Sequence, residues 1–180
     1  MILSDSAILS AIETGAIKID PFNPEQLNPA SLDLRLGNMV KYYENRVIDT
    51  RKDNPMITIP LSENGTKLHA NTLYLAACME RIEIDDTLVS HVFAKSSIGR
   101  FGVDVIKGPA GLIDPGFGGS LVLEITCTND TIVYPGDRIC QIEFIKVFGK
   151  VLVPYGSKPG SKYMGQVGVQ GSLNHLNFTK

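Results

Sequence analysis

From Ile17 onward the chain alternates between short apolar runs, rich in Ile, Val, Leu and Tyr, and turn-forming segments such as SENGT, DPGFGG, TND and YPGD. Short strands separated by Gly, Pro, Asn and Asp are typical of antiparallel sheets that form a sandwich or close into a barrel. We therefore expect a mainly β fold, a distorted β-barrel or jelly roll. The runs 119–128 and 138–153 are the most hydrophobic and are expected to cross the core, and Asn64-Gly65 predicts a tight hairpin turn.

One short amphipathic helix is expected before the strands. Ser4 or Asp5 can act as its N-cap, apolar residues recur at helical spacing between positions 8 and 12, and Gly15 is placed to end it. At the other end of the chain, residues 155–180 are rich in Gly and Ser and poor in periodic hydrophobic residues. Alone, such a segment buries little apolar surface, so we expect it to order as a lid over a ligand or a neighbouring subunit.

Length and charge restrict the function. The 180 residues fit one domain, 1–180, and are enough to bury a core. A formal net charge of -2 gives no sign of a surface for long nucleic acid, so no nucleic-acid partner is expected. No stretch approaches the roughly 20 apolar residues of a membrane span, and the N-terminus does not resemble a signal peptide. We expect a cytoplasmic protein without a membrane partner.

Metal-binding spacings are not found in the sequence. The three cysteines lie singly in strand-like runs, the three histidines are scattered, and neither H-x-E nor C-x-x-C occurs. We therefore expect the cysteines to be buried reduced thiols and neither the cysteines nor the histidines to bind a metal. We also expect the chain to lack the zinc site with which many cytidine deaminases activate water. The cysteines and histidines are Cys78, Cys127, Cys140, His69, His91 and His175.

The segment AKSSIGR, residues 94–100, combines two cations with two hydroxyls. Lys95, Ser96 and Arg100 suit a polyphosphate, although a polar turn at a strand end explains them equally well. Glu124 in LVLEIT lies among apolar residues that indicate a strand buried on both faces. Because a buried carboxylate is destabilising unless it is paired or functional, this pattern favours proton transfer over a structural or solvent-facing role.

Two further residues each have a functional and an ordinary interpretation. Asp114 in LIDPGFGG suits a ribose hydroxyl or a water, with Phe117 stacking against the sugar, but D-P-G is also a common turn. Lys162 in GSKYMGQ can reach a terminal phosphate from a flexible lid, or it is a plain surface lysine.

Five motifs, taken in order, resemble those of the dCTP deaminase family, relatives of the trimeric dUTPases. They are PASLDLRLGN, AKSSIGRFG, AGLIDPGFGGSLVLEI, GDRICQIEF and YGSKPGSKYMGQVGVQGS, and they span residues 28–172. The resemblance implies a dUTPase-like β-clip assembled as a homotrimer. It also implies active sites between subunits and a C-terminal tail, 155–180, that closes over the nucleotide.

The resemblance also implies roles for single residues. Glu124 is the implied general acid/base that deaminates dCTP to dUTP and ammonia without zinc, and Ser96 and Arg100 position the water. Mg²⁺ is expected to enter with the triphosphate. The implied nucleotide-binding positions are Lys95, Ser96, Ser97, Ile98, Gly99, Arg100, Asp114, Val122, Leu123, Glu124, Gln141, Tyr155, Lys162 and Gln166.

Two departures from the family pattern leave the substrate open. Lys95 stands where the family usually has Arg, and FGVDVIKGPAGLID lacks the usual histidine, is one residue longer and contains Pro109. One alternative is a dUTPase, in which Asp114 activates the water that attacks the α-phosphate to give dUMP and pyrophosphate. A second is a bifunctional enzyme that uses Glu124 and Asp114 to turn dCTP into dUMP. A third is a nucleotide-binding trimer without catalysis.

Overall fold

The computed structural model describes residues 1–105 and 111–178. The helical elements are α1 (Asp5–Glu13), α2 (Ser96–Gly99) and the 3₁₀ turns η1 (Pro24–Gln26), η3 (Tyr155–Ser157) and η4 (Asn174–Asn177). The strands are β1 (Ile17–Asp20), β2 (Leu27–Asn28), β3 (Ser31–Tyr43), β4 (Met56–Pro60), β5 (Thr66–Leu68), β6 (Tyr74–Ile84), β7 (Leu88–Ala94), β8 (Val103–Asp104), β9 (Leu112–Ile113), β10 (Gly118–Cys127), β11 (Thr131–Val133) and β12 (Arg138–Lys146).

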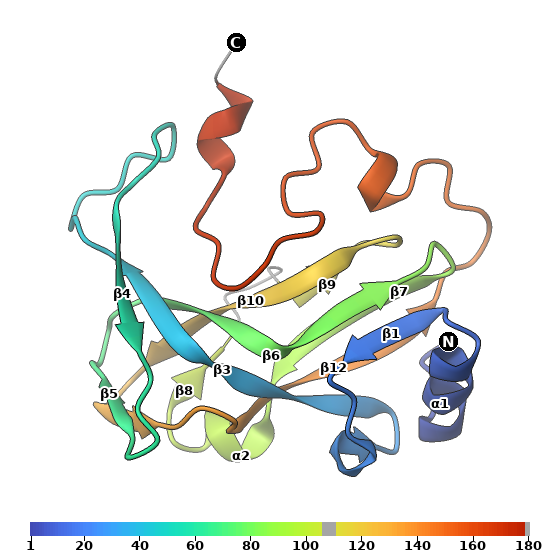
Figure 1. Ribbon diagram of the computed structural model, residues 1–180, viewed down its shortest axis with the longest axis horizontal. Helices are drawn as coiled ribbons and strands as arrows, with labels where there is room; N and C mark the ends of the chain where they lie inside the picture. Colours follow the sequence, from blue (N-terminus) through green and yellow to red (C-terminus); the bar gives the residue numbers. More distant parts are fainter. Residues whose placement is uncertain (106–110, 179–180) are drawn as a thin grey trace.

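Ten strands of the described chain form one curled sheet with antiparallel pairing (Figure 1). Its main path runs β8-β10-β6-β3-β12-β7-β9, with β1 also paired to β6 and both β2 and β4 paired to β3. Strands β5 and β11 form a separate pair. The mainly β, distorted barrel fold predicted from the sequence is confirmed. None of the described helices is long and apolar enough to span a membrane.

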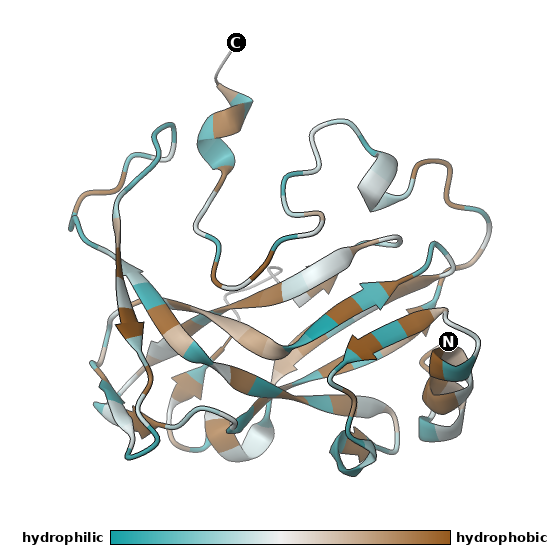
Figure 2. Ribbon diagram, in the orientation of Figure 1, coloured by the Kyte–Doolittle hydropathy of each residue, from teal (hydrophilic) through white to brown (hydrophobic). Residues whose placement is uncertain are grey.

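The helix α1 forms as its sequence predicts. The Ser4 hydroxyl accepts a hydrogen bond from the Ala7 amide, and the chain leaves the helix through Gly15 at φ 78°. Ile8 is fully buried against the sheet core. The helix therefore packs one apolar stripe against the sheet core. Hydrophobic and hydrophilic residues alternate along the neighbouring β1 (Figure 2).

Strand β10 is buried on one face only. Leu121, Leu123 and Ile125 are buried, whereas Val122 and Glu124 lie on the opposite, partly exposed face. The prediction of a strand buried on both faces is therefore wrong, because the two-residue period of a strand separates Glu124 from its apolar neighbours. The C-terminal segment crosses over this face in Figure 1.

Two local predictions need correction. Gly65 does adopt φ 94° and closes a turn onto the Ser62 carbonyl, but β5 pairs with β11 instead of with β4, so no hairpin forms there. The predicted core strand 138–153 is also too long, since β12 ends at Lys146.

The C-terminal tail lies against its own chain. The β6–β10 register shifts between Ser120 and Val122, and the Ser120 amide donates to the Gln166 carbonyl at 2.9 Å. The Ser120 hydroxyl accepts from the Gly168 amide, and Val169 is buried. The described part of the tail therefore finds hydrogen-bond partners within one chain, whereas the sequence suggested that it needs a ligand or a neighbour.

Candidate active site

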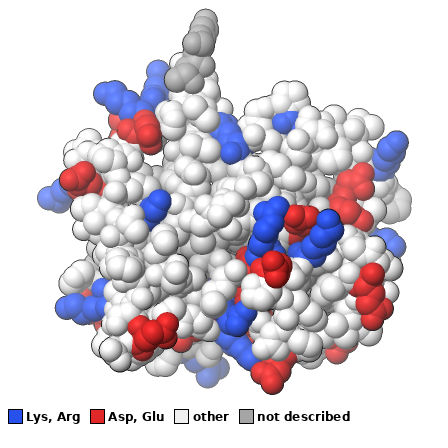
Figure 3. Space-filling view, in the orientation of Figure 1, with Lys and Arg blue, Asp and Glu red and all other residues white. Residues whose placement is uncertain are grey.

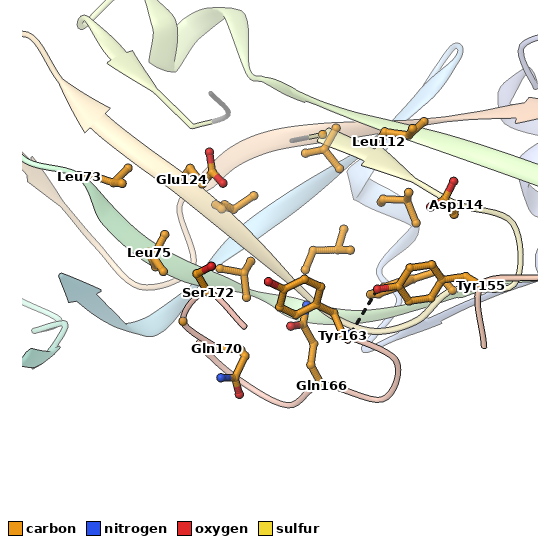
Figure 4. A pocket seen from close by; sticks show the side chains of 18 of the residues that line it. Leu73, Leu75, Leu112, Asp114, Glu124, Tyr155, Tyr163, Gln166, Gln170 and Ser172 are labelled. Atoms are coloured by element: carbon orange, nitrogen blue, oxygen red, sulfur yellow. Dashed lines mark hydrogen bonds between the residues drawn. The ribbon is translucent and has the colours of Figure 1, made fainter. Parts of the chain in front are cut away.

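A pocket of about 540 Å³ lies between β9, β10 and the C-terminal tail (Figure 4). We call it the first pocket. Its volume is within the range of small-molecule sites, and it is large enough for a nucleoside. Among its lining residues are six of the predicted site residues, namely Asp114, Val122, Leu123, Glu124, Tyr155 and Gln166.

Glu124 is positioned by the middle of β10. Glu124 is paired with Leu75 of β6 in the sheet register, and the Glu124 amide donates to the Val105 carbonyl at 3.0 Å. Leu73 and Leu75 line the same end of the pocket in Figure 4. The carboxylate therefore stands on a rigid strand beside an apolar wall, which suits a group that transfers protons to a bound ring.

Asp114 is positioned by a turn directly after β9. The Phe117 amide donates to the Asp114 carbonyl at 3.1 Å, and Gly116 adopts φ 82° after Pro115, as a type II turn requires. The turn places Asp114 at the end of the pocket opposite Glu124 in Figure 4. Phe117, which was predicted to stack against the sugar, lines the pocket. Its ring packs edge to face against the Tyr155 ring, with 5.7 Å between the ring centroids.

Two tyrosine hydroxyls hold the tail over this pocket. The Tyr155 hydroxyl accepts from the Tyr163 amide at 3.2 Å, shown dashed in Figure 4, and the Tyr163 hydroxyl accepts from the Leu173 amide at 3.1 Å. Tyr155 itself is tied to the turn, because its amide donates to the Pro115 carbonyl at 2.8 Å. Tyr163 was not predicted from the sequence, although an aromatic residue in a glycine-rich segment was an available signal.

Gln166 ties the tail to β10 at the edge of the pocket. Its side-chain amide nitrogen donates to the Ser120 carbonyl at 2.6 Å. Its oxygen, Oε1, is buried without a hydrogen-bond partner among the described residues. Buried polar atoms are nearly always paired, but this oxygen has almost no exposed surface, so a ligand in the pocket reaches it only if the Gln166 side chain moves.

The predicted phosphate-binding segment does not line this pocket. Helix α2 lies on the side of the sheet away from the tail in Figure 1. Ser96, Ser97, Gly99 and Arg100 are exposed, and Ile98 packs against the core. Gln141 belongs to this second region, since it faces Asp33 in the β3–β12 register.

Buried charges anchor this second region. Asp33 is 1% exposed and accepts from the Lys95 ammonium at 2.6 Å and from the Asn28 side chain at 2.9 Å. Glu80 is fully buried and accepts from the Arg35 side chain at 2.6 Å. Asp33 and Glu80 were not predicted from the sequence, although Asp33 lies between two apolar residues, as Glu124 does.

The cysteines are free, buried thiols, as predicted. Cys78 Sγ lies 3.9 Å from Cys140 Sγ, and this hydrogen bond, together with burial, raises the pKa of Cys78 well above its usual value. A raised pKa lowers the thiolate fraction, so Cys78 is a poor nucleophile.

The predictions for Lys162 and for the loop that contains Pro109 concern residues outside the first pocket or outside the described part of the chain. Lys162 lines a second pocket that borders the first. The interpretation of Pro109 and of the loop without histidine falls on residues 106–110, which lie outside the described residues.

The dCTP deaminase-like family model matches residues 2–147, and the chain belongs to this family. A Thermobifida fusca protein named dCTP deaminase, dUMP-forming, is 36% identical over 189 residues, which cover 100% of this chain and 96% of that protein. A Dictyoglomus thermophilum protein of the same name is 38% identical over 191 residues, which cover 100% of this chain and 98% of that protein.

A solved structure has the same fold. The 2'-deoxycytidine 5'-triphosphate deaminase from Agrobacterium tumefaciens matches with a TM-score of 0.66 and 27% identity. The match covers 81% of this chain and 48% of that chain, so this chain corresponds to about half of the solved one. The resemblance to the dCTP deaminase family, which five sequence motifs indicated, is confirmed.

Proposed function

We propose that this protein deaminates dCTP, with Glu124 as the general acid/base. The observation that carries the proposal is the first pocket, which combines Glu124, Asp114 and an apolar wall in a space of nucleoside size. Two relatives named dCTP deaminase, dUMP-forming, each align with the whole chain.

The chemistry follows from one carboxylate beside a bound cytosine. Glu124 takes a proton from a water, and the water oxygen bonds to C4 of the ring. Glu124 gives this proton to N3, then takes the second proton from the new C4 hydroxyl and gives it to the amino group. The C4–N bond breaks, ammonia leaves, and C4 keeps the water oxygen as a carbonyl. The products are a uracil nucleotide and ammonia.

Asp114 supports a second step in the same pocket. The relatives' names make dUMP the expected end product, and Asp114 stands at the opposite end of the pocket from Glu124. In this proposal, Asp114 activates a water that attacks the α-phosphate of dUTP. The bond from the α-phosphorus to the bridging oxygen breaks, which releases pyrophosphate and leaves dUMP.

We infer that a neighbouring subunit completes the site. In one chain, residues 95–100 and Gln141 lie apart from the first pocket, so the predicted phosphate contacts and the predicted base contacts do not meet. In a homotrimer, Ser96 and Arg100 of one copy would face the pocket of the next. We propose that magnesium enters the site with the triphosphate, as Mg–dCTP.

The test is a product analysis. Purified protein is incubated with dCTP, and separately with dUTP, in magnesium buffer, and nucleotides are resolved by ion-exchange chromatography. Wild type is expected to convert dCTP to dUMP, Glu124→Gln to lower the rate about 10²- to 10⁴-fold, and Asp114→Asn to accumulate dUTP. Glu63→Gln, an exposed glutamate, is the control. If wild type leaves both nucleotides unchanged, the proposal is wrong.

A mixing experiment tests the shared site. Glu124→Gln and Arg100→Met proteins are each expected to be inactive, but a mixed trimer contains sites with both intact residues. Random reassembly is expected to restore about a quarter of the activity. Failure to restore any activity, with mixed trimers present by mass spectrometry, contradicts a site between subunits.

A further inference from the structure

The paired ends of β3 and β4 contact the C-terminal tail. Tyr43, the last residue of β3, pairs with Met56, the first residue of β4, and we call these two residues the tail seat. The Tyr43 hydroxyl accepts a hydrogen bond from the Ser172 amide at 3.2 Å. A Cβ at Gly171 would lie 2.8 Å from Met56 Sδ and 4.0 Å from the Tyr43 hydroxyl oxygen. Gly171 therefore packs on the seat so closely that a side chain there has no room.

Met56 also belongs to a small apolar cluster beneath the tail. Val169 is buried there with Leu75 and Ala77, and Met56 and Val122 pack against these residues. Leu75 and Val122 also line the first pocket. The seat and one wall of the pocket are therefore parts of the same packed cluster.

The loop 44–55, between β3 and β4, holds the tail beyond the seat. The Asn174 side chain donates to the Thr50 carbonyl at 2.7 Å, and the Arg51 guanidinium lies 4.7 Å from the centre of the Phe178 ring. Figure 3 shows charged side chains of both signs where this loop meets the C-terminal segment. The end of the tail is therefore held by protein groups of the β3–β4 unit.

The tail connects the seat to the turn after β9. The Leu173 amide, next to Ser172, donates to the Tyr163 hydroxyl. The Tyr163 amide donates to the Tyr155 hydroxyl, and the Tyr155 amide donates to the Pro115 carbonyl. Both tyrosines line the first pocket. A contact that fixes Ser172 therefore also restrains the two rings over the pocket.

We propose that the tail seat preorganises the tail over the first pocket, and that Tyr43 and Met56 are positioning residues for the reaction. This rests on the proposed function, which places the base beside Glu124. The seat holds the tail in the same way over substrate and over transition state, so it stabilises both equally. Without the seat, the tail has to be ordered when the nucleotide binds, which raises KM and leaves kcat nearly unchanged.

Hydrogen exchange of the full chain without nucleotide tests the seat apart from catalysis. Gly171 has no positive φ, so valine there adds bulk without left-handed strain. Gly171→Val is expected to speed exchange of the Ser172 and Leu173 amides about tenfold, because its side chain clashes with Met56. Adding Met56→Ala makes room and is expected to remove most of this increase. Met79→Ala, at an exposed methionine outside both pockets, is the matched control and is expected to remove none.

Tyr43→Phe tests the hydroxyl of the seat. It keeps the ring and removes the acceptor of the Ser172 amide, so this amide is expected to exchange about fivefold faster. Tyr42→Phe is the control, because the Tyr42 ring packs against Tyr74 and lines neither pocket.

Steady-state deamination of dCTP tests positioning. Gly171→Val is expected to raise KM about tenfold and to keep kcat within about twofold, and Met56→Ala is expected to restore KM. A variant that only unfolds more easily has less active protein, which lowers kcat and leaves KM unchanged. A valine that blocks the pocket raises KM, but Met56→Ala would then not restore it.

Any of three results overturns the proposal. They are unchanged exchange at Ser172 and Leu173 in Gly171→Val, a lower kcat with unchanged KM, and failure of Met56→Ala to reverse the effects of Gly171→Val. If wild type does not deaminate dCTP, the proposed function is wrong, and the exchange data alone then decide whether the seat holds the tail.

Discussion

The Lys95 ammonium lies 2.6 Å from Oδ2 of the buried Asp33. The cation predicted to bind phosphate is therefore already paired inside its own chain. Its backbone amide is also held, by the Ile139 carbonyl at 3.1 Å. Lys95 thus fixes the start of α2, while the neighbouring Ser96 and Arg100 remain exposed.

Replacing the buried carboxylate should destabilise the fold. Asp33→Asn keeps the size of the side chain but removes the charge that pairs with Lys95 and accepts from Asn28. We expect a loss of about 1–3 kcal/mol in the free energy of unfolding, measured in urea, because hydrogen bonds to charged groups have this magnitude. Asp53→Asn changes an exposed carboxylate and serves as the control. Equal losses in the two variants would show that the Asp33–Lys95 pair is unimportant for stability.

Gly116 joins the Asp114 turn to the tail. A Cβ at Gly116 would lie 2.7 Å from Pro154 Cβ and 3.4 Å from the Tyr155 amide nitrogen, whereas a Cβ at Gly149 would meet nothing within 4 Å. Both glycines have positive φ, so alanine strains each backbone by about 1–2 kcal/mol.

Gly116→Ala is therefore expected to lower the free energy of unfolding by about 1–3 kcal/mol more than Gly149→Ala, since only it creates a steric clash. Urea unfolding measures the difference. Limited proteolysis should also cut residues 155–178 faster in Gly116→Ala. If the two variants are equally stable, the turn and the tail are not packed against each other in solution.

The fold was predictable where local signals agree. The helix α1 has its cap, its apolar stripe and its terminal glycine in sequence, and the alternation of strands and turns indicates an antiparallel β fold without further information. The partner of each strand was not predictable, because Asn64-Gly65 forms a turn without deciding that β5 pairs with β11.

The candidate site was predictable only in part, for a related reason. Motif order identified Glu124 and Asp114, which the structure places in one pocket. The sequence does not show that residues 95–100 lie apart from that pocket in one chain, since the separation depends on how the sheet curls. It also gives no sign that Lys95 pairs with Asp33, a contact between residues 62 positions apart.

The two tyrosines of the tail should protect specific amides. Tyr163→Phe removes the acceptor of the Leu173 amide without changing the ring that packs in the pocket. We expect this amide to exchange its hydrogen about fivefold faster, since one neutral hydrogen bond contributes about 1 kcal/mol. Residue-resolved hydrogen exchange measures the change, and Tyr134→Phe on the β11 side is the control. Unchanged exchange at Leu173 would mean that the tail is held by other contacts.

Glu83 should make stability depend on pH. Hydrogen bonds from the Lys18 ammonium, at 3.1 Å, and from Arg81, at 2.7 Å, lower the pKa of Glu83. Because the folded pKa lies below the unfolded one, the stabilisation is complete above the unfolded value of about 4.3 and is lost as pH falls through the folded value. The side chain is 35% exposed, so the contribution is expected to be below about 1 kcal/mol.

Glu83→Gln should remove this part of the acid sensitivity. Wild type is expected to lose more unfolding free energy than the variant between about pH 6 and about pH 3, and the two should differ most at the upper end of that range. Urea unfolding at several pH values measures both curves, with the exposed Glu63→Gln as a control for deleting a carboxylate. Added salt should reduce the difference at neutral pH, since it screens exposed pairs. Parallel curves for wild type and Glu83→Gln would show that Lys18 and Arg81 do not stabilise the ionised carboxylate in solution.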